Sequence, residues 1–294
     1  MLSIELFPSL NALQLHLLYG GALIAVSIAL LAFVTSEVTR NYSQIDKLWS
    51  IVPPVFTWYF AGASGWESRL VLMAALVTAW GARLTFNFWR RGGYSWPPWS
   101  GVEDYRWAVL RTNPLLAGPW RWRLFNLGFV SLYQVLLLLL ITLPAVTAAG
   151  AVRPLNLLDA VAAALFVGFL VLETAADQQQ FDFHTEKHRR RNAGEPLEAD
   201  VARGFRTTGL FALARHPNFA AEQAIWCSFY LFGVAATGQW LNWSIIGALL
   251  LILLFQGSTQ FTERISLGKY PGYAEYRRRV PRFLPRPWAR RPVF

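Results

Sequence analysis

The segment from Arg203 to Glu222 gathers polar and ionisable side chains directly before an apolar stretch, 219–238. These side chains are Arg203, Arg206, Arg215, His216, Asn218 and Glu222. Arginine binds phosphates through planar, bidentate hydrogen bonds. Membrane-surface anchoring and a helix cap would account for the arginines, but not for His216, Asn218 and Glu222. We therefore expect a site at a membrane surface where an anionic cofactor meets a pocket between helices.

The sequence Asp46-Lys47-Leu48-Trp49 is a second candidate for chemistry. Asp46 is either a general acid or a helix N-cap, since both roles suit a carboxylate at the start of a helix. Trp49 is a candidate substrate contact.

The stretch from 83 to 107 combines basic, amide and phenolic groups. Arg83 and Asn87 fall on one helical face at i, i+4 spacing, which predicts polar groups deep in an apolar helix. Arg83 is a candidate substrate contact. Tyr94 follows two glycines and is a candidate substrate contact. Tyr105 is a possible proton donor and Arg106 a possible phosphate ligand, but an acidic helix start at Glu103-Asp104 explains this block equally well.

Two more groups belong to the second half of the chain. Glu173 and Asp177 are four residues apart at the end of an apolar stretch, so both carboxylates share a helix face and should avoid lipid. They could bind ribose hydroxyls or an amide, or pair with an arginine. Tyr273 and Tyr276 lie in an aromatic, basic segment that either covers the site or lies flat on the membrane.

The elements that carry these groups are predicted to be transmembrane helices. The chain is 54% hydrophobic and 15% charged, with a mean hydropathy of +0.32. The apolar stretches indicate an all-α, integral-membrane bundle of seven helices. The predicted spans are 13–34, 48–63, 70–89, 124–148, 155–176, 219–238 and 241–261, the second being short and interrupted by Pro53-Pro54.

Charge predicts the orientation of this bundle. With the N-terminus outside, 24 of the 27 Lys and Arg fall on the inner side, which favours an N-out, C-in topology. The net charge of +10 then reflects sidedness and not nucleic-acid binding. We expect one integral-membrane domain over residues 1–294, in a bacterial inner membrane, with the site opening to the cytoplasm.

Cysteine and glycine usage narrow the chemistry. The single cysteine, Cys227, excludes an intramolecular disulfide and a Cys-based zinc site, and no metal is expected. No Gly-x-Gly-x-x-Gly follows a strand pattern, so a dinucleotide would have to bind outside a Rossmann fold.

The chain resembles the steroid 5α-reductase family, and more closely its bacterial membrane homologues. The resemblance rests on Gly209-Leu-Phe211, Arg215-His-Pro-Asn-Phe219, Glu222, Trp226, Tyr270-Pro271, Tyr273 and Tyr276. Asp46-Lys-Leu-Trp49 and Glu103-Asp-Tyr-Arg-Trp107 are similar to the bacterial group, and the match runs from about Asp46 to Pro285. It is most specific in the C-terminal half, about 155–285.

The resemblance implies NADPH as cofactor and reduction of the C4–C5 double bond of a 3-oxo-Δ4-steroid or a similar apolar enone. Asp177, Asn218 and Glu222 match cofactor contacts, flanked by Arg215 and His216; Arg106, Arg203 and Arg206 are further phosphate candidates, and Glu173, Tyr273 and Tyr276 further cofactor contacts. Asp46 and Asn87 stand where relatives place a Glu and a Tyr. Because Asn cannot donate a proton, Tyr94 or Tyr105 is the alternative acid.

A membrane methyltransferase that uses S-adenosylmethionine is the competing interpretation, since isoprenylcysteine and phospholipid methyltransferases show a similar Arg-His-Pro segment. The abundant arginines favour a cofactor with phosphates. A steroid-like substrate would enter from lipid between the early helices, with membrane lipids as the other partners. The sequence predicts no oligomeric state.

Overall fold

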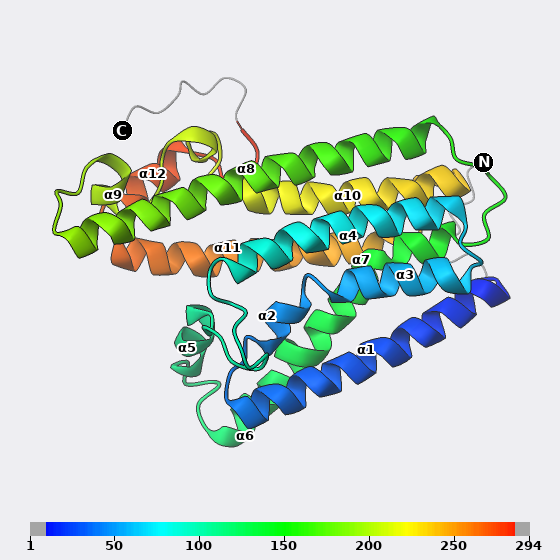
Figure 1. Cartoon of the computed structure of the whole chain (residues 1–294), viewed down its shortest axis with the longest axis horizontal. Helices are drawn as coiled ribbons and strands as arrows, with labels where there is room; N and C mark the ends of the chain where they lie inside the picture. Colours follow the sequence, from blue (N-terminus) through cyan, green and yellow to red (C-terminus); the bar gives the residue numbers. More distant parts are fainter. Residues whose placement is uncertain (1–9, 286–294) are drawn as a thin grey trace. The chain divides into compact units, whose positions relative to one another are not determined.

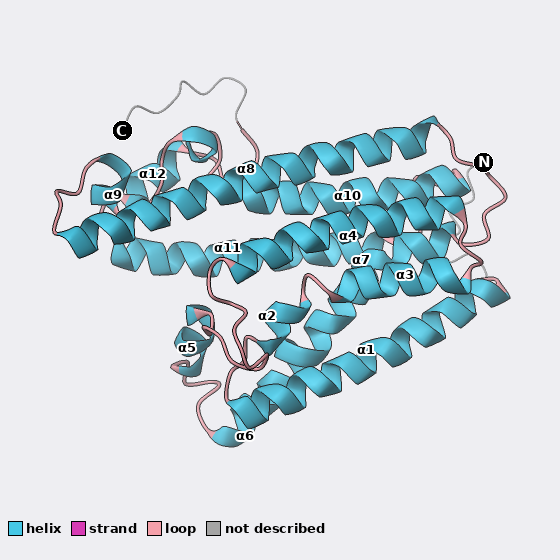
Figure 2. Cartoon of the chain, in the orientation of Figure 1, coloured by secondary structure: helices cyan, strands magenta, loops and turns pink. Residues whose placement is uncertain are grey.

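A computed structural model describes residues 10–285 of the chain, and every regular element within that range is helical (Figure 2). Six helical stretches are long and apolar enough to cross a membrane, which confirms the helical, membrane-spanning class. They are α1 (Ala12–Thr39), α4 (Ser68–Trp89), the run Pro119–Ala148, α8 (Leu157–Ala193), α10 (Pro217–Thr237) and α11 (Ile245–Lys269). Arg286, Arg290 and Arg291, which belong to the basic tail used to predict orientation, lie outside the described residues.

The second predicted span, 48–63, is not among these six. The structure divides it into α2 (Gln44–Leu48) and α3 (Val52–Ala63), with Pro53 and Pro54 at the first positions of α3. Proline is well tolerated in the first turn of a helix, because the backbone N–H groups there make no intrahelical hydrogen bond. Twelve residues rise about 18 Å, short of a bilayer core of about 30 Å. Nevertheless, this segment carries the chain from the end of α1 to the start of α4 (Figure 1).

Contacts divide the chain into two compact units, Met1–Ala163 with Ser228–Leu250 (unit 1) and Ala164–Cys227 with Leu251–Phe294 (unit 2). The expectation of a single domain stays a prediction. In unit 1, α3 packs on α4 and on α7 (Gln134–Ala148), while α1 packs on α7. Gly81 permits a close approach here, because a Cβ at this position would lie 2.4 Å from the Ser50 carbonyl oxygen.

The predicted fourth span is longer than expected and irregular. It runs through α6 (Pro119–Phe125), a π-helical segment η1 (Asn126–Tyr133) and α7. Asn126 is fully buried, and its Nδ2 donates to Ser36 Oγ at 2.9 Å and to Glu37 Oε1 at 2.9 Å. Because π-helical turns are often found at functional sites, and because a buried amide needs partners, this part of unit 1 has a specific geometry to maintain.

A buried ion pair joins two helix starts in unit 1. The Arg69 Nε and Nη2 donate to Asp159 at 2.8 and 2.9 Å, and the guanidinium also donates to the carbonyls of Arg153 and Pro154. Both side chains are almost completely buried. Every donor has an acceptor, which is the condition under which a buried charge pair is tolerated.

The helix α8 does not end where its apolar stretch ends. It runs from Leu157 to Ala193, 37 residues in all, which corresponds to a length of about 55 Å. The helix is therefore longer than a bilayer core is thick. In unit 2, the polar end of α8 is accompanied by α9 (Ala199–Arg203), the 3-10 turn η2 (Gly209–Ala212) and α12 (Tyr273–Arg279) (Figure 1). The polar residues that follow the predicted span 155–176 thus begin as a continuation of the same helix.

Candidate functional site

The start of α10 in unit 2 carries the segment Arg215-His216-Pro217. Pro217 is the first helical residue, and the Ala220 N–H donates to the His216 carbonyl at 3.0 Å. The backbone N–H groups of Arg215 and His216 donate to the carbonyls of Pro281 and Arg282, at 2.9 and 3.0 Å. The chain after α12 is thereby fixed against the entry to α10.

Glu263 on α11 is the centre of the charge cluster around this segment. Its Oε1 accepts from Arg215 Nε at 2.8 Å and lies 3.0 Å from His216 Nε2, while its Oε2 lies 3.2 Å from Arg277 Nε. The Glu263 side chain is only 2% exposed. A buried carboxylate with these partners is held as a structural ion cluster.

Arg215 is engaged on both sides of its guanidinium. Besides the bond to Glu263, its Nη1 donates to the carbonyls of Arg277 and Val280. The residue is 8% exposed. Arg215 therefore positions the chain segments around α10, and the predicted role in phosphate binding is not supported by free donors pointing outward.

Asn218 and Asp177 meet directly, as expected for two members of one site. Asn218 Nδ2 donates to Asp177 Oδ1 at 3.0 Å, which joins the first turn of α10 to α8. Asp177 is 5% exposed. Glu173, one turn earlier on α8, is equally buried, so the carboxylates predicted to avoid lipid both lie in the interior of unit 2.

Glu222 lies one turn beyond Asn218 on α10 and is 6% exposed. Its Oε1 accepts from Trp226 Nε1 at 2.9 Å. The intrahelical bond leaves the carboxylate fixed along the helix, next to the apolar part of α10. Four polar groups from α8 and α10 are thus buried in unit 2: Glu173, Asp177, Asn218 and Glu222, of which only Asn218 is partly accessible.

Arg203 and Arg206 flank a tight loop built around Asp200. Burial opposes the charge of Asp200, but hydrogen bonds from Thr207 and Thr208 outweigh it and hold its pKa below the ordinary value. Arg203 Nη1 donates to Asp200 at 3.2 Å, and Arg206 Nη1 donates to the Gln179 carbonyl at 2.7 Å. Of the two, Arg203 remains one-third exposed.

Tyr273 and Tyr276 lie in an aromatic cluster with Phe205, and both are buried. Burial raises the pKa of Tyr273 to about 12 and that of Tyr276 further, so both phenols stay protonated at neutral pH. Tyr276 Oη donates to the Phe211 carbonyl at 2.6 Å. Tyr276 therefore has a structural bond, and the prediction that it contacts a cofactor stays untested.

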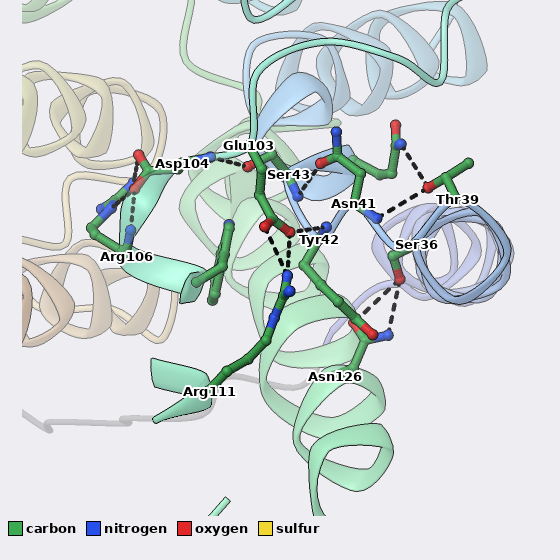
Figure 3. A network of polar contacts seen from close by, with 12 residues as sticks. Ser36, Thr39, Asn41, Tyr42, Ser43, Glu103, Asp104, Arg106, Arg111 and Asn126 are labelled. Atoms are coloured by element: carbon green, nitrogen blue, oxygen red, sulfur yellow. Dashed lines mark hydrogen bonds and ion pairs between the residues drawn. The ribbon is translucent and has the colours of Figure 1, made fainter. Parts of the chain in front are cut away.

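In unit 1, Asp46 on α2 accepts a hydrogen bond from Trp107 Nε1 at 3.0 Å. Desolvation raises the pKa of Asp46, against the lowering effect of Arg106 and of the Trp107 bond. Arg106 itself donates to Asp104 at 2.9 and 3.0 Å (Figure 3). Ser43 occupies the N-cap position of α2, so Asp46 is the third helical residue and not the N-cap, and its carboxylate also interacts with the Ser43 side chain. A carboxyl that keeps its proton more readily than usual can act as a hydrogen-bond donor.

The other candidate residues of unit 1 differ in their contacts and in their exposure. Trp49 Nε1 donates to Gln134 Oε1 at 2.6 Å, and Tyr94 Oη donates to the Lys47 carbonyl at 2.7 Å. Asn87 on α4 is 6% exposed and accepts from Arg90 Nε at 2.9 Å. Tyr105, by contrast, is 53% exposed at the start of α5 (Tyr105–Arg111), away from the interior.

Further side chains organise these sites through hydrogen bonds with the backbone of neighbouring loops. Gln179 accepts the Leu210 N–H at 2.9 Å, and Lys47 donates to the carbonyls of Pro98 and Ser100 at 3.0 and 2.5 Å. Arg264 on α11 is exposed and forms no ion pair within residues 10–285. The sequence places Thr259 and Glu263 on one face of an apolar helix at i, i+4 spacing, which predicts an interior role, and the structure adds that Glu263 pairs with Arg215.

Unit 2 contains hydrogen-bonding groups that suit the parts of a nicotinamide cofactor. The buried Asp177–Asn218 pair offers both a carboxylate and an amide, which suits a nicotinamide carboxamide or ribose hydroxyls. Arg264 is exposed, whereas Arg203 and Arg277 pair with Asp200 and Glu263 and are 33% and 46% exposed. In the described part of the chain, no three His, Cys, Asp or Glu side chains come together as a metal site.

Two comparisons place the chain among known proteins. A family described as "Protein of unknown function (DUF1295)" matches residues 32–280. An uncharacterized protein of Schizosaccharomyces pombe is 41% identical over 292 residues, covering 95% of this chain and 80% of the yeast protein. No solved structure matches. The family match covers both the Asp46 cluster and the Arg203–Glu222 segment, so the chain belongs to the DUF1295 family.

Proposed function

We propose that this protein is an NADPH-dependent reductase that acts on the carbon–carbon double bond of an apolar enone, as in the steroid 5α-reductases that it resembles. One observation supports this most directly. Asp177 on α8 and Asn218 on α10, which match cofactor contacts of those enzymes, are in hydrogen-bonding contact although 41 residues separate them. Buried ionisable groups in membrane helices are expensive and usually functional.

The proposed reaction adds a hydride to the β-carbon and a proton to the α-carbon, so that the double bond becomes single and NADPH becomes NADP⁺. In unit 2, Asp177 and Asn218 would orient the nicotinamide end, and Arg203, Arg264 and Arg277 would hold phosphates. Glu263 and Arg215 keep α10, α11 and the segment after α12 in register around them.

In unit 1, Asp46 is the group best suited to polarise a carbonyl oxygen. Hydride addition leaves negative charge on that oxygen, and a preorganised donor aimed at such charge is usually a large catalytic term. Desolvation raises the pKa of Asp46, so its protonated form can donate. Asn87 can add a second hydrogen bond, and the exposed Tyr105 is less suited than Tyr94 to act as the acid.

We further propose that residues 48–63 form a short second crossing, which gives seven passes and an N-out, C-in topology. The structure returns the chain between α1 and α4 through this segment. The inner side would then carry most of the arginines and the polar clusters around Asp46 and Asn218.

The methyltransferase alternative keeps one supporting observation. All four arginines predicted to hold phosphates donate to protein groups: Arg106 to Asp104, Arg203 to Asp200, Arg206 to Gln179 and Arg215 to Glu263. S-adenosylmethionine carries no phosphate and does not need them.

A ligand-dependent thermal shift of the detergent-purified protein distinguishes the two functions. A ligand that binds only the folded state raises the melting temperature. We expect NADPH to do so and S-adenosylmethionine not to. Asp177→Asn should abolish the shift, whereas Asp182→Asn, an exposed carboxylate on the same helix, should preserve it. A shift with S-adenosylmethionine alone would overturn the reductase assignment.

A further inference from the structure

A shallow hollow on unit 1, separate from the Asp46 cluster, is lined by cations and aromatic rings. Its walls are Arg40, Tyr42, Arg111, Leu116, Gly118, Pro119 and Trp122. It lies where two membrane-spanning stretches end together, since α1 finishes at Thr39 and the run Pro119–Ala148 begins there (Figure 1). The polar headgroups of a bilayer would meet the protein at this level.

Two aromatic rings in the wall of the hollow, those of Tyr42 and Trp122, pack against Arg111. The guanidinium carbon lies 4.7 Å from the Tyr42 ring centroid and 5.4 Å from that of Trp122, and these two rings meet edge to face at 5.0 Å. Arg111 Nη2 donates to both oxygens of Glu103, at 2.6 and 2.8 Å. Glu103 Oε1 also accepts the Tyr42 N–H at 2.8 Å (Figure 3).

This arrangement leaves donors for an outside ligand. Within residues 10–285, the Nε and Nη1 of Arg111 make no hydrogen bond, and its side chain is 39% exposed. Arg40 is exposed and its side chain has no ion-pair partner in the same range. Glu103 neutralises only one of the two charges, so the hollow keeps a positive excess.

The backbone of Arg40 also favours a specific role. Arg40 follows the last residue of α1 with a φ of 55°, in the left-handed region that glycine normally occupies at a helix C-terminus. A non-glycine residue is uncommon in this region. This backbone conformation directs the chain from the end of α1 into the loop that carries Tyr42.

The surroundings are apolar and exposed. Leu115, Trp120 and Leu124 are 79%, 74% and 62% exposed beside the hollow. A free phosphate ion makes no favourable contact with an apolar surface. The acyl chains of a lipid, by contrast, would pack against these side chains. Basic pockets beside transmembrane helices bind anionic lipid headgroups for this combination of reasons.

We propose that this hollow binds the phosphate of an anionic phospholipid, with Arg40 and Arg111 as its two charge-assisted donors and Leu115, Trp120 and Leu124 against the acyl chains. The site is independent of the proposed reductase activity. It orders the loop between α5 and α6 against the end of α1 when lipid is bound.

Native mass spectrometry of the delipidated full chain tests this proposal. The probes are phosphatidylglycerol, phosphatidylcholine and inorganic phosphate. Phosphatidylglycerol should bind more tightly than phosphatidylcholine, and Arg40→Gln should weaken its binding about fivefold, the effect of one arginine near a membrane surface. The matched control is Arg121→Gln, which removes the same charge from an exposed residue of α6 outside the hollow. It should weaken binding less than twofold.

A second variant guards against a fold defect. Arg111→Lys keeps the charge and can still pair with Glu103 but loses the planar contact with Tyr42 and Trp122, so it should weaken phosphatidylglycerol binding while leaving the melting temperature of the lipid-free protein within a few degrees. Three results would overturn the proposal: equal losses in Arg40→Gln and Arg121→Gln, equal binding of the two lipids, or displacement of phosphatidylglycerol by millimolar phosphate.

Discussion

At the scale of single residues, three carboxylates differ in their surroundings, and these surroundings suit them to different roles. Asp46 is desolvated and meets an indole N–H, so its neutral form is favoured. Glu263 is surrounded by two arginines and a histidine and acts as a structural anion. Asp177 is buried and accepts a hydrogen bond from the Asn218 amide. The same functional group therefore serves as candidate acid, structural anchor and candidate ligand contact.

The Asp46→Asn variant should separate catalysis from stability. A raised folded-state pKa means that the contribution of Asp46 to the free energy of unfolding is present at low pH and lost as the pH rises through that pKa. Asp46→Asn should therefore gain stability relative to wild type as the pH increases from 4 to 8, measured by thermal melting. Under the proposed function, turnover should fall about 100-fold or more. A stability difference that is constant with pH would contradict the assignment of a raised pKa.

Glu263→Gln should be strongly destabilising. Removing one partner of a buried ion pair leaves the other charge uncompensated and costs about 3–5 kcal/mol, and Arg215 would be in that position. Glu275→Gln is the control, because Glu275 pairs with Arg278 and Arg279 at the surface, where such pairs contribute about 0–1 kcal/mol. Denaturant or thermal unfolding of both variants checks the difference, and equal effects would show that the Glu263 cluster is not structural.

At the scale of elements, the polar extension of α8 forms hydrogen bonds that fix the loops beside it. The extension of α8 brings Gln179 to the Gly209–Ala212 turn, where Gln179 Oε1 accepts the Leu210 N–H. It also brings Lys187 to the Gly204 carbonyl at 2.6 Å. The polar segment between α9 and α10 is therefore held by side chains of α8, and its geometry depends on close contacts.

Gly209→Ala should disturb this turn. Gly209 has a φ of 64°, and a Cβ there would lie 2.5 Å from Gln179 Oε1. We expect a loss of about 1–3 kcal/mol from the strained backbone alone. Gly168→Ala is the matched control, since Gly168 lies within α8 with nothing near its added Cβ, and the substitution should stabilise the helix by about 0.5–1 kcal/mol. Thermal melting compares the two, and a neutral Gly209→Ala would argue against the close contact.

At the scale of the whole molecule, the sequence crosses between the two units within α8, α10 and α11, so neither unit is a continuous segment. The candidate cofactor contacts of the second half belong to unit 2, whereas Asp46, Asn87 and the lipid hollow belong to unit 1. The number of passes determines which of these groups share a side of the membrane.

Single-cysteine labelling in cells tests the seven-pass topology. Cys227 is exposed and the sole cysteine, so Cys227→Ser provides the background. Arg40→Cys and Ser68→Cys should label from opposite sides if residues 48–63 cross the membrane. Glu198→Cys should label only after permeabilisation. Labelling of residues 40 and 68 from the same side would leave six passes.

The sequence by itself determined the helical membrane class and most span positions, and it predicted buried ionisable groups that the structure confirms, such as Glu173 and Asp177. It did so because apolar runs of about 20 residues and buried ionisable groups are one-dimensional signals. The tertiary structure decided the rest. Glu263 as the partner of Arg215 and His216, Trp107 as the partner of Asp46, and the exposure of Tyr105 depend on which helix faces meet, and no local pattern encodes that. The division of span 48–63 into α2 and α3 likewise became visible only when its packing on α4 and α7 was known.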